Sequence, residues 1–233
     1  MSRQIPEVEM KLLQLMVLVA VLGVMAPAMS PLECGGMGDD DDDDDDMGEP
    51  VVFAPLNEDG VVADVDVERY LGTWREIAVD PQFFSIFCTN TTATYGYYDD
   101  DTVTVFNSCN WFNLDGPNIT ISGFASIVDP AVPAKLRVNF GDEPAERGAP
   151  YWIIELDGRE TDEPYEWAVV GGPTLNELFI LHRSPQPDDA QIEAIIDRLV
   201  ERGYDPEEWS FTEQPMEQPM EQPMEQPEEN PAS

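Results

Sequence analysis

The sequence predicts an all-β fold, an eight-stranded antiparallel up-and-down barrel with one C-terminal α-helix packed outside. Short runs rich in threonine, valine, isoleucine and aromatic residues follow one another between residues 72 and 183, which is typical of β-strands. The connections, such as Asp-Asp-Asp and Leu-Asp-Gly-Pro, are long enough only to join neighbouring antiparallel strands. Strands in that order lose their exposed edges when the sheet closes into a barrel.

Eight strands are expected, at residues 72–79, 89–98, 102–109, 118–127, 135–140, 150–157, 165–171 and 177–183. One helix is expected at 188–202, where apolar residues recur at three- and four-residue spacing: Ile192, Ile195, Ile196, Leu199 and Val200. Asp188 suits the amino end of this helix and Gly203 its carboxyl end. A last short strand at 209–212 should pair with the first strand.

The two ends of the 233-residue chain differ in composition from its middle. Residues 1–28 are interpreted as a signal peptide, because a lysine, an apolar run and Ala-Pro-Ala follow one another. The alternative is a membrane-spanning helix, but the apolar run is short for a segment that has to cross a bilayer. The acidic first nine residues leave the start at Met1 or Met10 open. Residues 29–50 should be a disordered acidic linker, 51–212 the folded domain, and 213–233 a disordered tail of Met-Glu-Gln-Pro repeats.

The formal net charge of −37 excludes some partners. Residues 51–210 alone contain 30 acidic and 9 basic residues, so the folded domain itself is strongly negative. Nucleic acid and anionic membrane surfaces are therefore not expected to bind it.

The stretch YLGTWREI opens the first expected strand with Gly72 and Trp74. Glycine permits backbone conformations that other residues avoid, and tryptophan carries a large apolar surface. If Trp74 points inward, it seals one end of the barrel.

The segment VDVERYLGTWREIA resembles the signature of the lipocalin family, and LFILHRSP, YWIIELD and YEWAVVGGP resemble its later conserved blocks. The resemblance covers residues 64–212 and is greatest to the bacterial lipocalins and apolipoprotein D. It implies that Arg183 lies over Trp74, with Gly72, Trp74 and Arg183 in structural roles. The insertion GRETDEP at 158–164 departs from the family; its Thr161 and Asp162 either restore the family's Thr-Asp pair or lengthen the hairpin.

Strand alternation, with Trp74 inward, predicts the lining of a ligand cavity. The expected lining residues are Glu76, Ala93, Tyr95, Tyr97, Val105, Asn107, Phe179 and Leu181. Tyr95, Asn107 and Phe179 also match positions that line the cavity in apolipoprotein D, according to the resemblance. Filling of the barrel by its own side chains is the alternative.

Three cysteines in an exported chain indicate one disulfide and one leftover thiol. Cys88 and Cys109 flank the hairpin that turns at 99–101, so antiparallel pairing should bring them together, and their bond should stabilise the fold by about 3 kcal/mol. Cys34 follows the signal and is a candidate for lipidation, although Glu33 fits that motif poorly; cleavage after Ala28 and free secretion is the rival.

We expect a binding protein, not an enzyme, with no metal and no cofactor. His182 is the one histidine, so no histidine-based triad or multi-histidine metal site can form. The expected function is extracytoplasmic binding and transport or storage of a small hydrophobic ligand, such as a fatty acid, a lysophospholipid or a similar lipid. The expected location is secreted or at the cell surface, with membrane contact only if Cys34 is lipidated, and the oligomeric state stays open. The alternatives are an enzyme acting on a lipid or isoprenoid through Glu76, Tyr95 or Tyr97, and an acidic surface protein that uses the barrel as a scaffold.

Overall fold

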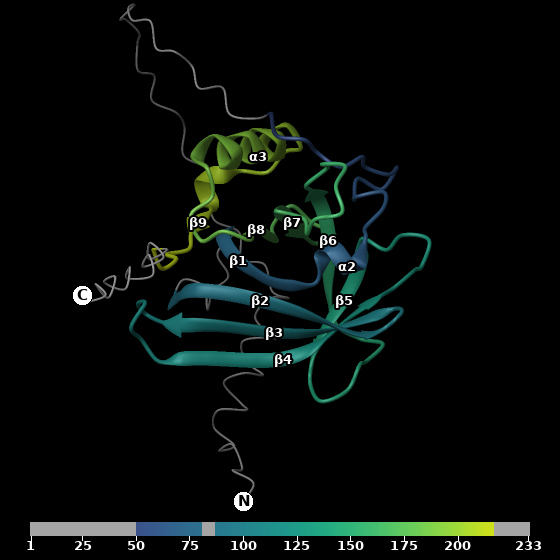
Figure 1. Ribbon diagram of the computed structural model, residues 1–233, viewed down its shortest axis with the longest axis horizontal. Coiled ribbons are helices and arrows are strands. Elements are labelled where there is room, and N and C mark those ends of the chain that lie inside the picture. The colour runs from purple at the N-terminus through teal and green to yellow at the C-terminus, as the bar shows by residue number, and fades with distance from the viewer. Residues whose placement is uncertain (1–49, 81–86, 217–233) are drawn as a thin grey trace, which may run out of the picture.

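The first strand, β1 (Gly72–Val79), pairs antiparallel with both β2 (Cys88–Asp99) and β8 (Leu178–His182), and this closes the sheet into a barrel. The computed structural model describes residues 50–80 and 87–216, and Figure 1 shows the arrangement. The other strands pair in chain order: β3 (Thr102–Trp111), β4 (Asn118–Ile127), β5 (Lys135–Phe140), β6 (Ala149–Leu156) and β7 (Trp167–Gly171). The predicted up-and-down barrel is confirmed, and each predicted strand end lies within two residues of the observed one.

Helix α3 (Asp189–Glu201) packs on the outside of the barrel, on the side away from β2, β3 and β4 (Figure 1). The Asp188 carboxylate caps its first turn by accepting hydrogen bonds from two backbone amides, and Gly203 follows it at a positive φ of 93°. Ile192, Ile195 and Leu199 are buried against the sheet as predicted. The prediction for Val200 is wrong, because it lies at the edge of the apolar stripe and is 46% exposed.

Two buried carboxylates on the outer side of the barrel are paired with arginines. Glu155, at 0% exposure, accepts hydrogen bonds from Arg198 at 3.2 Å and Arg202 at 2.7 Å, both on or next to α3. Asp157, at 1% exposure, accepts from Arg159 at 2.7 Å. Each charge therefore has a partner of opposite sign.

The closed end of the barrel is covered by α2 (Val67–Tyr70) and by the connection between β6 and β7. Asp66 caps α2 through its carboxylate. The GRETDEP insertion lies in this connection, where Arg69 of α2 donates a hydrogen bond of 2.7 Å to the backbone oxygen of Glu163. This hydrogen bond fixes the connection between β6 and β7 to α2.

The C-terminal residues fill a seam between β1 and β2. These strands pair only from Gly72–Tyr95 to Arg75–Thr92, and beyond that point they diverge. Strand β9 (Ser210–Phe211), which follows the 3₁₀ helix η3 (Pro206–Glu208), pairs with the end of β1 as predicted. The Asn90 amide donates to the Glu213 backbone oxygen at 2.7 Å. Glu213, Gln214 and Pro215 therefore contact the barrel or the segment before α3, although they lie beyond residue 212, the predicted end of the folded domain.

Several predicted segments lie outside the described residues: the signal at 1–28, Cys34, the acidic linker up to residue 49 and the repeats from 217 onward. Within the described ranges, no helix has the length and apolarity needed to cross a membrane.

Candidate ligand-binding site

The closed end of the barrel is built on Trp74 and Arg183. The Trp74 indole is fully buried, its nitrogen donates to the Tyr70 backbone oxygen at 2.9 Å, and the Arg183 guanidinium lies over its ring. The guanidinium also donates to five backbone oxygens, those of Arg69, Tyr70, Leu71, Thr73 and Tyr165. Gly72 has a φ of 97°, and a Cβ there would approach Arg183 to 3.3 Å, so both conformation and space favour glycine.

A cavity of about 370 Å³ occupies the barrel interior on the open side of Trp74. Seven of the eight predicted residues line it: Glu76, Ala93, Tyr95, Val105, Asn107, Phe179 and Leu181. Trp74 and Arg183 are not among the lining residues, which agrees with their structural assignment. The barrel is therefore not filled by its own side chains. That these seven residues bind ligand stays a prediction.

Tyr97 does not line the cavity and is 64% exposed, so its assignment to the lining is corrected. It lies on β2 two residues beyond Tyr95, which already pairs with Gly72, the first residue of β1. Tyr97 thus projects past the end of the neighbouring strand, and its hydroxyl donates to Asp100 in the hairpin turn.

Tyr95 and Tyr151 line the inner end of the cavity, and Tyr70 contacts both of them. The Tyr95 hydroxyl donates to the Tyr151 hydroxyl at 2.9 Å, and the Tyr151 and Tyr70 hydroxyls lie 2.8 Å apart. Burial raises the pKa of Tyr95 to about 12 and the pKa of Tyr151 well above its ordinary value, so both phenols stay neutral. Their hydroxyls are engaged with one another and seal the inner end of the cavity.

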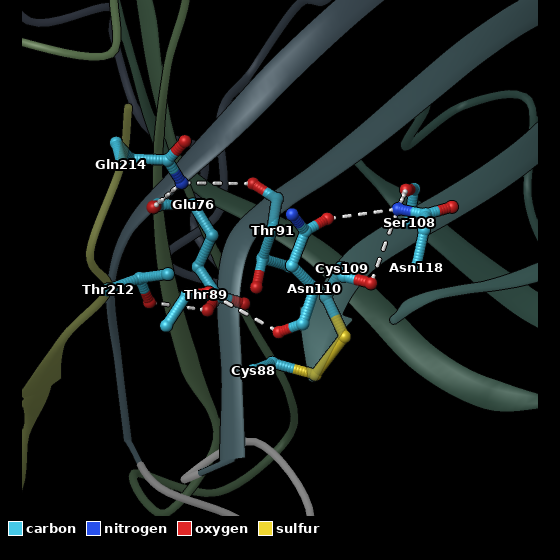
Figure 2. Close-up of a disulfide and its surroundings, with 10 residues drawn as sticks. All are labelled: Glu76, Cys88, Thr89, Thr91, Ser108, Cys109, Asn110, Asn118, Thr212 and Gln214. Carbon is cyan, nitrogen blue, oxygen red and sulfur yellow. Dashed lines mark hydrogen bonds between the residues drawn. A yellow bond between two sulfur atoms is a disulfide. The ribbon is translucent and has the colours of Figure 1, made fainter. Parts of the chain in front are cut away.

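Glu76 is a carboxylic acid in the cavity wall and is only 6% exposed. Figure 2 shows its side chain beside Thr212. The Thr212 hydroxyl donates to its Oε1 at 2.6 Å. The Gln214 amide nitrogen bridges the seam by donating to the Glu76 and Thr91 backbone oxygens, at 2.8 and 3.1 Å. Burial raises the pKa of Glu76 to about 7, and the hydrogen bond from Thr212 offsets part of that rise.

Several residues that line the cavity were not predicted from the sequence. Tyr151, Val138 and Ile121 share strand alternation with inward neighbours and could have been found by it. Asp80 and Glu177 border the connections at the open end and also line the cavity. Burial raises the pKa of Asp80 to about 6, with smaller contributions from Glu208 and Glu177. Strand alternation could not identify Asp80 and Glu177 as lining residues, because it does not extend into loops. The sequence indicated only that both lie next to the ends of strands.

The predicted disulfide joins Cys88 to Cys109, with their Cα atoms 5.5 Å apart (Figure 2). Both cysteines contribute to the cavity wall near the open end. The bond fastens the start of β2 to β3 where the pairing shifts register between Thr89 and Thr92. It acts as a structural link within the wall.

The described residues contain no group of three histidine, cysteine or acidic side chains arranged to hold a metal ion. His182 is buried between the barrel and α3, where its Nδ1 accepts from the Ser184 amide and its Nε2 donates to Gln191. Burial lowers its pKa. The cavity chemistry therefore rests on carboxyl, hydroxyl and amide groups.

Comparison with known proteins places residues 65–214 in a family described as Lipocalin-like domain. Temperature-induced lipocalin-1 of Arabidopsis thaliana is 35% identical over 151 residues, which cover 62% of this chain and 77% of the relative. Outer membrane lipoprotein Blc of Escherichia coli K12 is 34% identical over 156 residues, 66% of this chain and 82% of the relative. Apolipoprotein D of Mus musculus is 31% identical over 163 residues, 66% and 79% of the two chains.

Among solved structures, insecticyanin of the tobacco hornworm Manduca sexta is similar, with a TM-score of 0.51 and 19% identity. The match covers 70% of this chain and 89% of that one. At this identity the likeness concerns the fold alone.

Proposed function

The chain belongs to the lipocalin family, and from this membership and the cavity we propose that it binds one small hydrophobic ligand for transport or storage. Lipocalins are known for binding such ligands, and the relatives are generally binding proteins. A lipid with a single alkyl or acyl chain is the proposed ligand class, with fatty acids and lysophospholipids as the first examples to test.

The observation that carries the proposal is the 370 Å³ cavity, closed below by the tyrosines and Trp74 and walled mainly by apolar side chains. Transfer of an alkyl chain from water into such a space is favourable by roughly 0.8 kcal/mol per methylene, less the cost of ordering the chain. A preformed cavity keeps that cost low.

We further propose that binding takes place outside the cytoplasm, with the protein secreted or at the cell surface. The apolar run near the amino terminus and the Cys88–Cys109 disulfide support export. One relative is named an outer membrane lipoprotein, which makes a lipid anchor at Cys34 worth testing by mass spectrometry of the mature amino terminus.

Native mass spectrometry of the purified full chain tests binding directly, with displacement of the neutral dye N-phenyl-1-naphthylamine as a second readout. We expect co-purifying lipid or dye binding at one site per chain. Val105→Trp should fill the cavity and abolish binding, whereas Phe106→Trp should not, because the neighbouring Phe106 faces solvent and is 44% exposed. Circular dichroism of both variants checks folding, and Ala93→Leu is the milder cavity-filling variant. Equal binding by all variants would refute the proposal.

A lipid-directed enzyme is the second candidate, favoured by one observation. The pKa of Glu76, about 7, suits a general acid or base at neutral pH. Incubation of a lipid mixture with the protein and with Glu76→Gln, followed by mass spectrometry, tests it: turnover that is lost in Glu76→Gln supports catalysis, and unchanged lipids refute it.

A further inference from the structure

The charged side chains that line the cavity all have the same sign. They are Glu76 deep in the wall and Asp80 and Glu177 at the open end. No lysine, arginine or histidine of the described residues lines the cavity. A ligand with a negative head group would therefore enter a space where every ionised group repels it.

The chain places cations beside its other buried carboxylates. Glu155 contacts Arg198 and Arg202, and Asp157 contacts Arg159. Glu76 is also buried, at 6% exposure, yet the groups that lower its pKa are the neutral hydroxyls of Thr212 and Thr91, and no basic group contributes to that pKa. Burying a carboxylate without a cation is costly. Among the described buried carboxylates, the one that lacks a cation is the one that faces the cavity.

An acceptor without a donor lies in the same wall. The amide oxygen of Asn107 is buried and has no hydrogen-bond partner among the described residues. Such an acceptor needs a donor to offset its desolvation. Asn107 therefore favours a ligand that donates hydrogen bonds.

Basic residues elsewhere do not reverse the charge of the cavity. Arg183 is held over Trp74 at the closed end, and Lys135 pairs with Asp59 on the surface. Arg147 lies in the connection between β5 and β6 at the open end, but it is exposed, and that connection also carries Asp142, Glu143 and Glu146.

We infer that the cavity selects a cationic amphiphile, an apolar chain with a protonated amine as its head group, over a carboxylate of the same length. The ammonium would donate hydrogen bonds to the carboxylates of the wall and supply the cation that Glu76 lacks. The inference rests on the proposed function and narrows its ligand class away from fatty acids.

Three probes of equal chain length test the head group: dodecylamine, dodecan-1-ol and dodecanoate, each titrated into the full chain at pH 7.5 by calorimetry and by dye displacement. We expect the amine to bind at least about tenfold more tightly than the carboxylate, with the alcohol between them. Glu76→Gln should weaken amine binding by about tenfold and change alcohol binding by less than about twofold.

The matched control is Glu193→Gln, which removes the same charge from the exposed face of α3 and should leave all three affinities unchanged. If Glu76→Gln does not fold, Asp80→Asn with Glu177→Gln tests the open end. A preference for the carboxylate, or an amine preference that survives both sets of substitutions, overturns the inference and leaves binding intact. Failure of all three probes to bind or to displace the dye overturns the proposed function itself.

Discussion

The guanidinium carbon of Arg183 lies 3.7 Å from the centroid of the Trp74 indole ring. Stacking of this kind contributes about 1 kcal/mol or more when water is excluded. Because the same guanidinium donates to five backbone oxygens around α2, β1 and β7, one side chain holds three parts of the closed end together. Neither residue lines the cavity, so we expect both to contribute to stability and not to ligand binding.

Arg183→Lys should lower the free energy of unfolding by about 2–4 kcal/mol, because an ammonium reproduces neither the flat stack nor the fork of donors. Urea denaturation measures the change. Arg137→Lys, on an exposed position of β5, is the control and should stay within about 0.5 kcal/mol of the wild type. Similar losses in the two variants would contradict the structural role of Arg183.

Glu76 should make the protein less stable as pH rises. Its pKa is about 7 in the folded state and 4.5 in the unfolded reference, so the folded state binds more protons between these values. Stability from this group is full below about pH 4.5 and is lost through pH 7, by about 3 kcal/mol in total. Glu76→Gln should remove this component. The difference in unfolding free energy between variant and wild type, measured at pH 5 and pH 8, would be constant if the idea is wrong.

Arg202→Met should destabilise the protein by about 3 kcal/mol, because Glu155 stays fully buried and loses its shorter ion pair. Adding Glu155→Met to this variant should recover part of the loss, since the buried charge, which Arg198 alone pairs in the single variant, is then removed. Thermal unfolding of the single and double variants measures both effects. A double variant less stable than Arg202→Met would count against the argument.

Tyr95→Phe should cost about 1 kcal/mol of stability, because the Tyr151 hydroxyl loses a donor at the inner end of the cavity. Tyr97→Phe is the matched control on the same strand, and its exposed hydroxyl should be worth less than about 0.5 kcal/mol. If chemical denaturation gave equal losses for Tyr95→Phe and Tyr97→Phe, the hydrogen bonds among the buried tyrosines would contribute no more to stability than an exposed hydroxyl does.

Removing the disulfide by Cys88→Ala with Cys109→Ala should lower stability by about 3 kcal/mol, since the two cysteines are separated by 21 residues. Ligand affinity at low temperature should change little, because the register of β2 and β3 is also fixed by backbone pairing. A reductant titration of the wild type should reproduce the loss.

The barrel could be predicted because its signals are local. Each strand shows its own alternation of inward and outward residues, and turn residues mark where it ends. Alternation also identified Glu76, Asn107 and Phe179 as inward residues. It failed at Tyr97 because it gives the face of a strand and not how far the neighbouring strand extends.

The seam could not be foreseen from the sequence. Thr212 and Gln214 contact Glu76 across more than 130 positions of chain, and nothing in a Glu-Gln-Pro repeat indicates such a contact. The lack of a counter-ion for Glu76 among the described residues could not be foreseen either, because it depends on where the basic side chains of that part of the chain lie in space.

The docking of Thr212 and Gln214 redefines where a recombinant form of this barrel has to stop. An expression clone that ends at Phe211 would remove the hydroxyl bonded to Glu76 and the amide that bridges the two diverging strands. The barrel wall between β1 and β2 would then be open to water. Affinity tags and fluorescent fusions therefore belong after Met216, because that position keeps the contacts of Thr212, Gln214 and Pro215.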